Sequence, residues 1–113
     1  MSEYDEQVAL ITWFRMAYPK LIMFAIPNGE FRHIGTAIRL KKSGVVAGVS
    51  DLFLMKPNKH FSGLFIEMKA KGGKVSPQQK YFIEQAIANG YAAYVCFGFD
   101  DAQSVIVQYL NDI

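Results

Sequence analysis

Four short apolar runs constrain the fold of this chain more than any other feature. They are LIMFAI (21–26), GVSDLFLM (48–55), GLFIEMKA (63–70) and YAAYVCFG (91–98). Each has the length of a buried strand and is bounded by turn residues. The segment KPNKHFSG, which leads from the second run into the third, contains Pro, Asn and Gly, which favour a turn. These two strands are therefore expected to pair as an antiparallel hairpin.

The segments between these runs have apolar residues at helical spacing instead. Ser2, followed by Asp5, resembles a capping box, and Ser76 with Pro77 forms a second helix start. Helices are expected at about 3–18, at about 30–43 with Gly44 as C-cap, from Ser76 to Gly90, and from Asp100 or Asp101 to Leu110. The order α-β-α-β-β-α-β-α predicts an α/β fold, with a mixed central sheet flanked by helices in a single domain over residues 1–113.

Length and composition favour one core and an intracellular protein. A chain of 113 residues, of which 51% are hydrophobic, is expected to bury about two-thirds of its unfolded surface. The single cysteine, Cys96, cannot form an intrachain disulfide, which indicates a reducing, cytoplasmic compartment. The acidic N-terminus lacks signal-peptide features, and no apolar run approaches the roughly 20 residues of a membrane span. We therefore expect no membrane partner.

The charge distribution is uneven. A formal net charge of +2 is too small to indicate nucleic-acid binding by itself. From Arg32 to Lys80, however, Lys and Arg predominate, and the acids in this stretch are Asp51 and Glu67 alone. The middle of the chain is therefore basic, with two isolated carboxylates whose positions require an explanation.

The third apolar run contains two charged residues, Glu67 and Lys69. Because side chains alternate along a strand, both lie on the same face. Asp51 opens the preceding strand, and the hairpin would bring it opposite or diagonal to Glu67. Two carboxylates at this separation repel one another unless a proton or a cation lies between them, and such oxygen ligands suit Mg²⁺ or Mn²⁺. A nearby lysine can orient water or neutralise charge on a phosphate, so the three residues predict a hydrolytic phosphodiester site.

Five motifs occur in order along the chain: Glu6 in the first helix, PNG (27–29), GVSDL (48–52), EMK (67–69) and SPQQ (76–79). Over nearly the whole chain this set resembles the VRR-NUC family, the virus-type replication-repair nucleases of the restriction-endonuclease-like PD-(D/E)XK superfamily. One position departs from the family pattern, because Ser50 stands where a proline usually precedes the aspartate. A proline there would stiffen the backbone without touching the metal.

The resemblance implies roles for several residues. Asp51, Glu67 and the Met68 carbonyl would bind Mg²⁺ or Mn²⁺, and Lys69 would act on the nucleophilic water. Flanking helices would supply two further catalytic residues, which are Gln79 and Glu6, the latter also a candidate metal ligand. The implied activity is that of a metal-dependent, structure-selective endonuclease that hydrolyses DNA phosphodiester bonds.

Small stand-alone members of the family are similar to Holliday-junction resolvases. The resemblance therefore implies a homodimer that cuts branched DNA, with replication or repair proteins as further partners. Lysines of the Gly-rich turn after the third strand and basic residues of the second helix are candidate DNA contacts; they are Lys71, Lys74, Arg39 and Lys42. Both a phage and a bacterial genome are compatible with these features.

Simpler interpretations stay open at this point. Glu67 and Lys69 could be an exposed cross-strand pair that contributes a few tenths of a kcal/mol. Asp51 could cap its strand, and Glu6 is an acid in the first turn of a helix, where the dipole favours any acid. Gln78 rivals Gln79. At the level of function, the alternatives are a weakly active or inactive nuclease fold retained for DNA binding or assembly, and a nuclease that acts on RNA.

Overall fold

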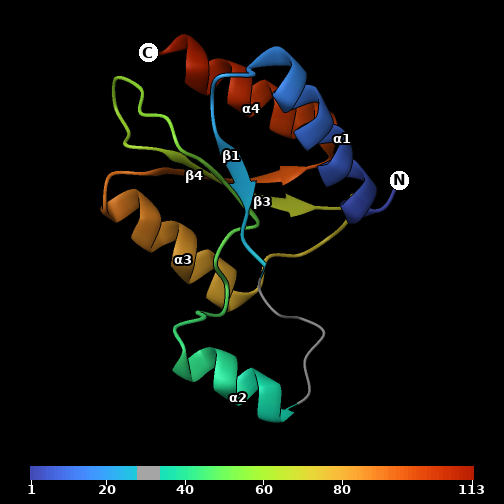
Figure 1. Ribbon diagram of the computed structural model, residues 1–113, viewed down its shortest axis with the longest axis vertical. Helices are drawn as coiled ribbons and strands as arrows, with labels where there is room; N and C mark the ends of the chain where they lie inside the picture. Colours follow the sequence, from blue (N-terminus) through green and yellow to red (C-terminus); the bar gives the residue numbers. More distant parts are fainter. Residues whose placement is uncertain (28–33) are drawn as a thin grey trace.

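The computed structural model describes residues 1–27 and 34–113, and its elements follow the predicted order (Figure 1). The helices there are α1 (Glu3–Ala17), α2 (Ile34–Lys42), α3 (Pro77–Ala88) and α4 (Phe99–Asn111), and the strands are β1 (Met23–Ala25), β2 (Leu52–Leu54), β3 (Leu64–Lys69) and β4 (Ala92–Phe97). No helix in these ranges combines the length and apolar character that a membrane crossing requires. His33 and the last two residues of the PNG motif lie outside the described residues.

The sheet is mixed, as predicted. In the described residues its strand order is β1-β2-β3-β4, with antiparallel pairing from β1 to β3 and a parallel pair between β3 and β4. The expected β2–β3 hairpin forms and aligns Leu52 with Ile66. α3 connects β3 to β4, because two parallel strands need a crossover that returns the chain to the same end of the sheet.

Helices cover both faces of the sheet (Figure 1). α1 and α4 lie together on one side, where Leu10, Phe14 and Ile106 join the core with the even-numbered residues of β3. α3 lies on the other side, where Phe65 contacts Phe82 with ring centroids 5.0 Å apart. Because side chains alternate along β3, its odd-numbered residues, including both charged ones, belong to the face that α3 covers.

The predicted helix caps form at α1 and α3. The Asp5 N–H donates to Ser2 Oγ over 3.0 Å, and Asp5 accepts in return from the Ser2 N–H. Ser76 and Gln79 make the same reciprocal pair at the start of α3. Gly90 follows α3 with φ of +93°, a left-handed conformation that glycine adopts without a steric cost. Local sequence therefore determines where these two helices begin and where α3 ends.

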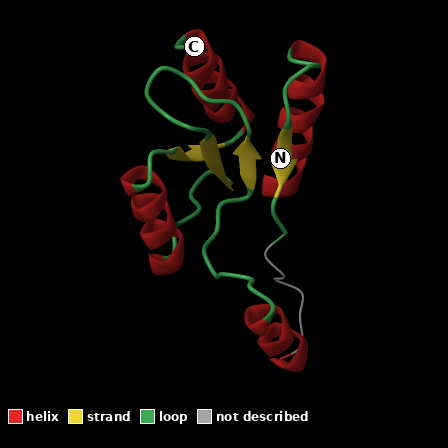
Figure 2. Cartoon of the chain, turned by 60° about the vertical axis from the view of Figure 1, so that its left-hand side comes forward, coloured by secondary structure: helices red, strands yellow, loops and turns green. Residues whose placement is uncertain are grey.

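α2 stands apart from the sheet and the other helices. Figures 1 and 2, which differ by 60°, both show it separated from the body of the molecule. The radius of gyration is 14.3 Å, whereas a compact chain of this length has about 13 Å. The basic helix predicted from the sequence is present, but nothing in its own pattern indicates that it projects from the fold.

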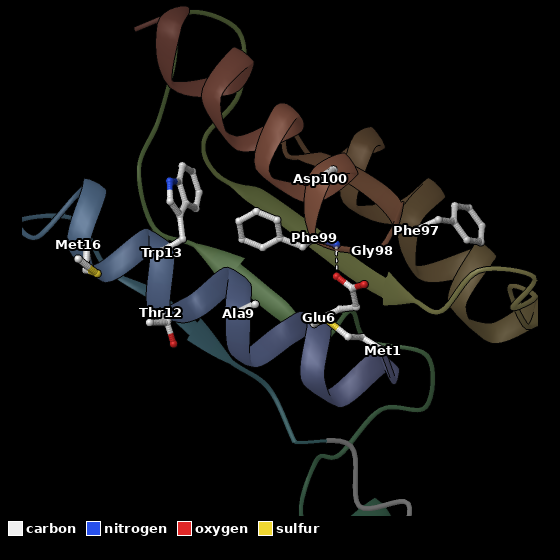
Figure 3. Close-up of a pocket in the computed structure, with 10 residues that line it drawn as sticks. All are labelled: Met1, Glu6, Ala9, Thr12, Trp13, Met16, Phe97, Gly98, Phe99 and Asp100. Atoms are coloured by element: carbon white, nitrogen blue, oxygen red, sulfur yellow. Dashed lines mark hydrogen bonds between the residues drawn. The ribbon is translucent and has the colours of Figure 1, made fainter.

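α4 differs from the prediction at its first turn. It begins at Phe99, after Gly98, so neither Asp100 nor Asp101 is its N-cap. Instead the Glu6 carboxylate of α1 accepts a hydrogen bond from the Phe99 N–H over 2.6 Å (Figure 3). Glycine has no side chain that can cap a helix, and an acid from a distant helix satisfies the free N–H. Such a contact cannot be inferred from local sequence.

Gly48 allows the segment before β2 to lie directly on the first turn of α3. Its φ is +90°, and a Cβ atom at this position would lie 2.4 Å from the carbonyl carbon and oxygen of Gln78 and 2.8 Å from the Gln79 nitrogen. Real Cβ atoms do not approach backbone this closely. The glycine of the GVSDL motif therefore sets the distance between the Asp51 segment and α3.

Candidate active site

Four of the predicted site residues, Asp51, Glu67, Lys69 and Gln79, line one hollow of about 390 Å³. This acidic hollow lies at one end of the sheet, between the beginnings of α1, β2 and α3 and the end of β3. Its other lining residues are Glu3, Ala47, Gly48, Ser76 and Gln78. The hairpin and the crossover helix thus bring together residues that are well separated in the sequence.

Asp51 lies directly before β2, next to Glu67. Because Leu52 pairs with Ile66, the hairpin register places the preceding residue of the β2 segment beside the following residue of β3. The Asp51 carboxylate accepts a hydrogen bond from the Met68 N–H over 2.8 Å. This bond holds the side chain against β3 and directs one carboxylate oxygen to the backbone of the predicted ligand residue.

Glu67 is a buried acid with incomplete hydrogen bonding. Only 3% of its surface is exposed. Its Oε2 atom accepts a hydrogen bond from Gln79 Nε2 over 3.2 Å and lies 3.8 Å from Lys69 Nζ. Its Oε1 atom is buried and has no hydrogen-bond partner among the described residues. A buried carboxylate oxygen without a partner is costly, so this atom needs a proton or a cation.

The electrostatic surroundings of Glu67 support the same conclusion. Burial is the largest cause that raises its pKa from an ordinary 4.5 to about 8, followed by the negative charge of the adjacent Asp51 carboxylate. The positive charge of Lys69 lowers this pKa, but it does not offset the other causes. Two carboxylates therefore compete for one positive charge in a buried place, as the sequence predicts.

Gln79 links α3 to the acidic hollow. Its Oε1 atom accepts from the Ser76 N–H over 2.9 Å, completing the capping box, while its Nε2 atom donates to Glu67. One side chain thus caps a helix and positions a carboxylate. Gln78 also lines the hollow, but the hydrogen bond to Glu67 distinguishes Gln79 from its neighbour.

The first-helix acid in the hollow is Glu3 and not Glu6. Glu6 is occupied by the Phe99 N–H at the start of α4 and does not line the acidic hollow. Glu3 lies one helical turn earlier, lines the hollow, and its negative charge contributes to the raised pKa of Glu67. The structure thus places Glu3, and not Glu6, beside the predicted ligands, because one turn of α1 separates the two carboxylates. Both acids lie in the first turn, so sequence alone did not separate their roles.

Substitution of the two α1 acids is expected to have opposite consequences. Glu3→Ala should reduce any cleavage about tenfold, with little change in stability, because Glu3 is exposed and lines the hollow. Glu6→Ala should lower the free energy of unfolding by about 1–2 kcal/mol, because α4 loses its cap. Urea unfolding and cleavage assays on both variants check this. If Glu6→Ala reduced cleavage without a loss of stability, and Glu3→Ala did not reduce cleavage, Glu6 would be the acid that acts in the site.

The donor atoms of the hollow fit one hard divalent cation. Carboxylate oxygens of Asp51 and Glu67 are the type of ligand that Mg²⁺ and Mn²⁺ prefer, and the Oε1 atom of Glu67 is free to accept. Among the described residues, no group of three His, Cys, Asp or Glu side chains is arranged to bind a metal. The available ligands are therefore the carboxylates of Asp51 and Glu67 and the backbone carbonyl of Met68. A zinc site of Cys and His is not supported in this part of the chain.

Without metal, the stability of the protein should depend on pH through Glu67. Its pKa is about 8 when folded and 4.5 ordinarily, so between these values the folded chain holds a proton that the unfolded chain has lost. The free energy of unfolding should therefore fall as the pH rises from about 4.5 to about 8. Urea unfolding in chelator at several pH values measures this. Glu67→Gln should flatten the slope in this range, and an equal slope in both proteins would contradict the assignment.

The predicted DNA contacts lie outside the hollow. Lys71 and Lys74 are exposed on the turn after β3, and Arg39 and Lys42 are exposed on α2. Both segments adjoin the site along the chain, since β3 ends at Lys69 and the segment after α2 leads to Gly48. These four cations are free to contact phosphates around the hollow, but none of them lines it.

The mixed sheet and the Asp–Glu–Lys group at its end define a domain of nuclease type. A family model for the VRR-NUC domain matches residues 1–100 of the chain. A solved structure, described as a VRR_NUC domain protein, is similar over 98% of this chain and 89% of that chain, with a TM-score of 0.82 and 28% sequence identity. Comparison with curated proteins found no match. The chain belongs to the VRR-NUC domain family, as its motifs predict.

Proposed function

We propose that the protein is a divalent-metal-dependent endonuclease that hydrolyses phosphodiester bonds in branched DNA. The observation that carries this proposal is the buried Glu67 carboxylate beside Asp51, with an ammonium group 3.8 Å from its Oε2 atom. An acid whose pKa is raised by burial and by a neighbouring carboxylate has no structural benefit by itself. It is explained if a cation and a phosphate bind there.

The polar residues of the hollow that were predicted from the sequence would have distinct roles in this reaction. Asp51, held by the Met68 N–H, and Glu67, held by Gln79, would bind Mg²⁺ or Mn²⁺ together with the Met68 carbonyl. When bound, the ion would lower the pKa of water and stabilise charge on the phosphate oxygens. Lys69, whose side chain is 13% exposed, would orient the attacking water or neutralise the charge that develops on the phosphate.

A preference for branched DNA would arise from shape and symmetry. The described residues form one sheet with its helices, and no separate sequence-reading module is present among them. A two-fold dimer would present two acidic hollows to a four-way junction, in an arrangement that matches the symmetry of the junction. Exposed lysines and arginines beside each hollow would bind the backbone without reading sequence.

The test is a cleavage assay on single-stranded, duplex, flap and four-way DNA and on matching RNA, with Mg²⁺, Mn²⁺ or chelator. Cleavage should require metal, favour the four-way junction, and fall by about a hundredfold or more in Lys69→Ala. Cleavage that survives chelator would overturn the proposed mechanism. Binding without cleavage in every metal would instead support a DNA-binding or assembly module, and preferential cleavage of RNA would change the substrate class.

A further inference from the structure

A second hollow adjoins the acidic hollow at the beginning of α1. It has a volume of about 280 Å³, and both hollows are lined by Glu3 and Asp51. The other described residues that line this second hollow, here called the Tyr4 hollow, are Tyr4, Gln7, Ala25, Ile26 and Pro27. It therefore lies between the first turns of α1 and the end of β1. Because the two hollows share two residues, a group bound in the Tyr4 hollow would lie next to the proposed cation and the phosphate that is cut.

Two side chains of the Tyr4 hollow are free to bind a ligand. Tyr4 is 76% exposed, and its side chain makes no hydrogen bond or ring contact with another described residue. Gln7 is half-buried, and its amide likewise makes no hydrogen bond among the described residues. An exposed aromatic ring can stack on a flat group, and an amide can both donate and accept hydrogen bonds. The hollow thus suits a planar ligand with a polar edge.

Charge and size indicate which part of a nucleic acid fits this hollow. Among its described lining residues only Glu3 and Asp51 are charged, and both are acidic, so a phosphate would be repelled. A nucleobase has no charge, and its face stacks on aromatic side chains. The volume of about 280 Å³ is just below the range of roughly 300–1,000 Å³ for pockets that hold drug-sized ligands. The hollow therefore suits a single base.

We infer that the Tyr4 hollow binds one unpaired base of the DNA, from a nucleotide close to the bond that is cut, with the base stacked on Tyr4 and its edge against the Gln7 amide. A base inside a duplex is stacked and paired, so it reaches such a pocket only when it is turned out of the helix. This step costs least for a base that is already unpaired. The hollow would therefore favour DNA with an unpaired nucleotide at a branch over an intact duplex.

This inference deepens the proposed function and rests on it, because the position of the base is defined relative to the cleaved bond. Tyr4 does not line the acidic hollow, so its role is to bind the substrate and not to take part in the chemical step. Since the side chain is exposed and without contacts to described residues, Tyr4→Ala should fold normally. A loss of cleavage in this variant should therefore depend on the base that the ring contacts.

Single abasic nucleotides in the substrate test this dependence. They are placed in turn at each position that flanks the cut in a branched DNA. With wild-type protein, one position should lower kcat/KM about tenfold. Tyr4→Ala should lower kcat/KM on the normal DNA to the same extent, with no further loss on the DNA that is abasic at that position. Tyr4→Phe, which keeps the ring, and Tyr81→Ala, a change at a tyrosine 64% exposed on α3 outside both hollows, should behave like the wild type.

Three results of the abasic experiment would overturn the inference. The first is a wild-type protein that tolerates an abasic nucleotide at every position. The second is a Tyr4→Ala variant that cleaves like the wild type. The third is a pair of losses that multiply when the variant meets the abasic DNA, because independent losses would mean that ring and base do not touch.

A fluorescent base provides a readout that does not depend on cleavage. The base analogue 2-aminopurine replaces the unpaired base at the branch, and the DNA is saturated with Lys69→Ala protein in Mg²⁺, since Lys69 does not line the Tyr4 hollow. Stacking on the ring should quench the analogue relative to the Lys69→Ala, Tyr4→Ala double variant. Equal fluorescence in the two complexes, together with normal cleavage by the wild type, would refute the base site and leave the nuclease proposal intact. Quenching without any cleavage by the wild type would support the base site and refute the nuclease proposal.

Discussion

Replacement of Asp51 by asparagine should abolish cleavage, with a loss of about a thousandfold or more, which corresponds to about 4 kcal/mol of transition-state stabilisation. The asparagine oxygen can still accept the Met68 hydrogen bond, so the hairpin should keep its register. What is lost is the negative charge that, with Glu67, would hold the cation. Steady-state cleavage of a four-way junction in Mg²⁺ measures the effect.

Glu67→Gln provides the companion measurement. It should lose activity to the same extent, while the metal-free protein becomes more stable near pH 8, because a buried acid no longer ionises beside Asp51. Glu84→Gln is the control, since Glu84 is an exposed acid of α3. Near-normal cleavage by Asp51→Asn and by Glu67→Gln would show that neither carboxylate is required for the reaction.

Among substitutions of residues other than the acids of the hollow, Gly48→Ala should cause the largest loss of stability and cleavage. The added Cβ would lie 2.4 Å from backbone atoms of Gln78, and the φ of +90° is strained for any L side chain. Overpacking and backbone strain together should lower the free energy of unfolding by about 2–5 kcal/mol. The folded fraction of this variant should also cleave poorly, because the added Cβ atom would push α3 and Gln79 away from Glu67. Urea unfolding and cleavage per folded molecule measure both effects.

Gly44→Ala is the matched control for Gly48. Its φ is +111°, but a Cβ atom there would meet nothing within 4 Å, so only the backbone strain remains. We expect a loss of about 1 kcal/mol without an effect on cleavage. Equal stability losses at the two glycines would mean that the contact between the Gly48 segment and α3 is unimportant for the site.

Local signals were sufficient for much of the fold. The capping boxes at Ser2 and Ser76 and the turn residues between β2 and β3 act within a few residues, so their outcome can be read from the chain. The alternation along β3 and the hairpin together predict that Asp51 and Glu67 share a face, and the structure places both in one hollow. These are contacts that secondary structure itself imposes.

Contacts between distant elements could not be predicted in this way. Glu6 was expected to flank the site, but its carboxylate contacts the Phe99 N–H, 93 residues away, and nothing near either residue indicates this contact. The same contact explains why α4 begins without the expected aspartate cap. Glu3 was missed because both acids suit the first turn of a helix. The separation of α2 from the body likewise depends on the tertiary arrangement, since its helical pattern is that of an ordinary packed helix.

The most direct test is to locate Mn²⁺ in crystals of the protein by anomalous scattering. The account predicts a peak in the acidic hollow at about 2 Å from a carboxylate oxygen of Asp51 and from Oε1 of Glu67, a distance typical of a hard cation and its oxygen ligands. The peak should disappear in Asp51→Asn. A hollow without a peak at saturating Mn²⁺, or an ion bound by only one of the two carboxylates, would contradict the shared-cation site.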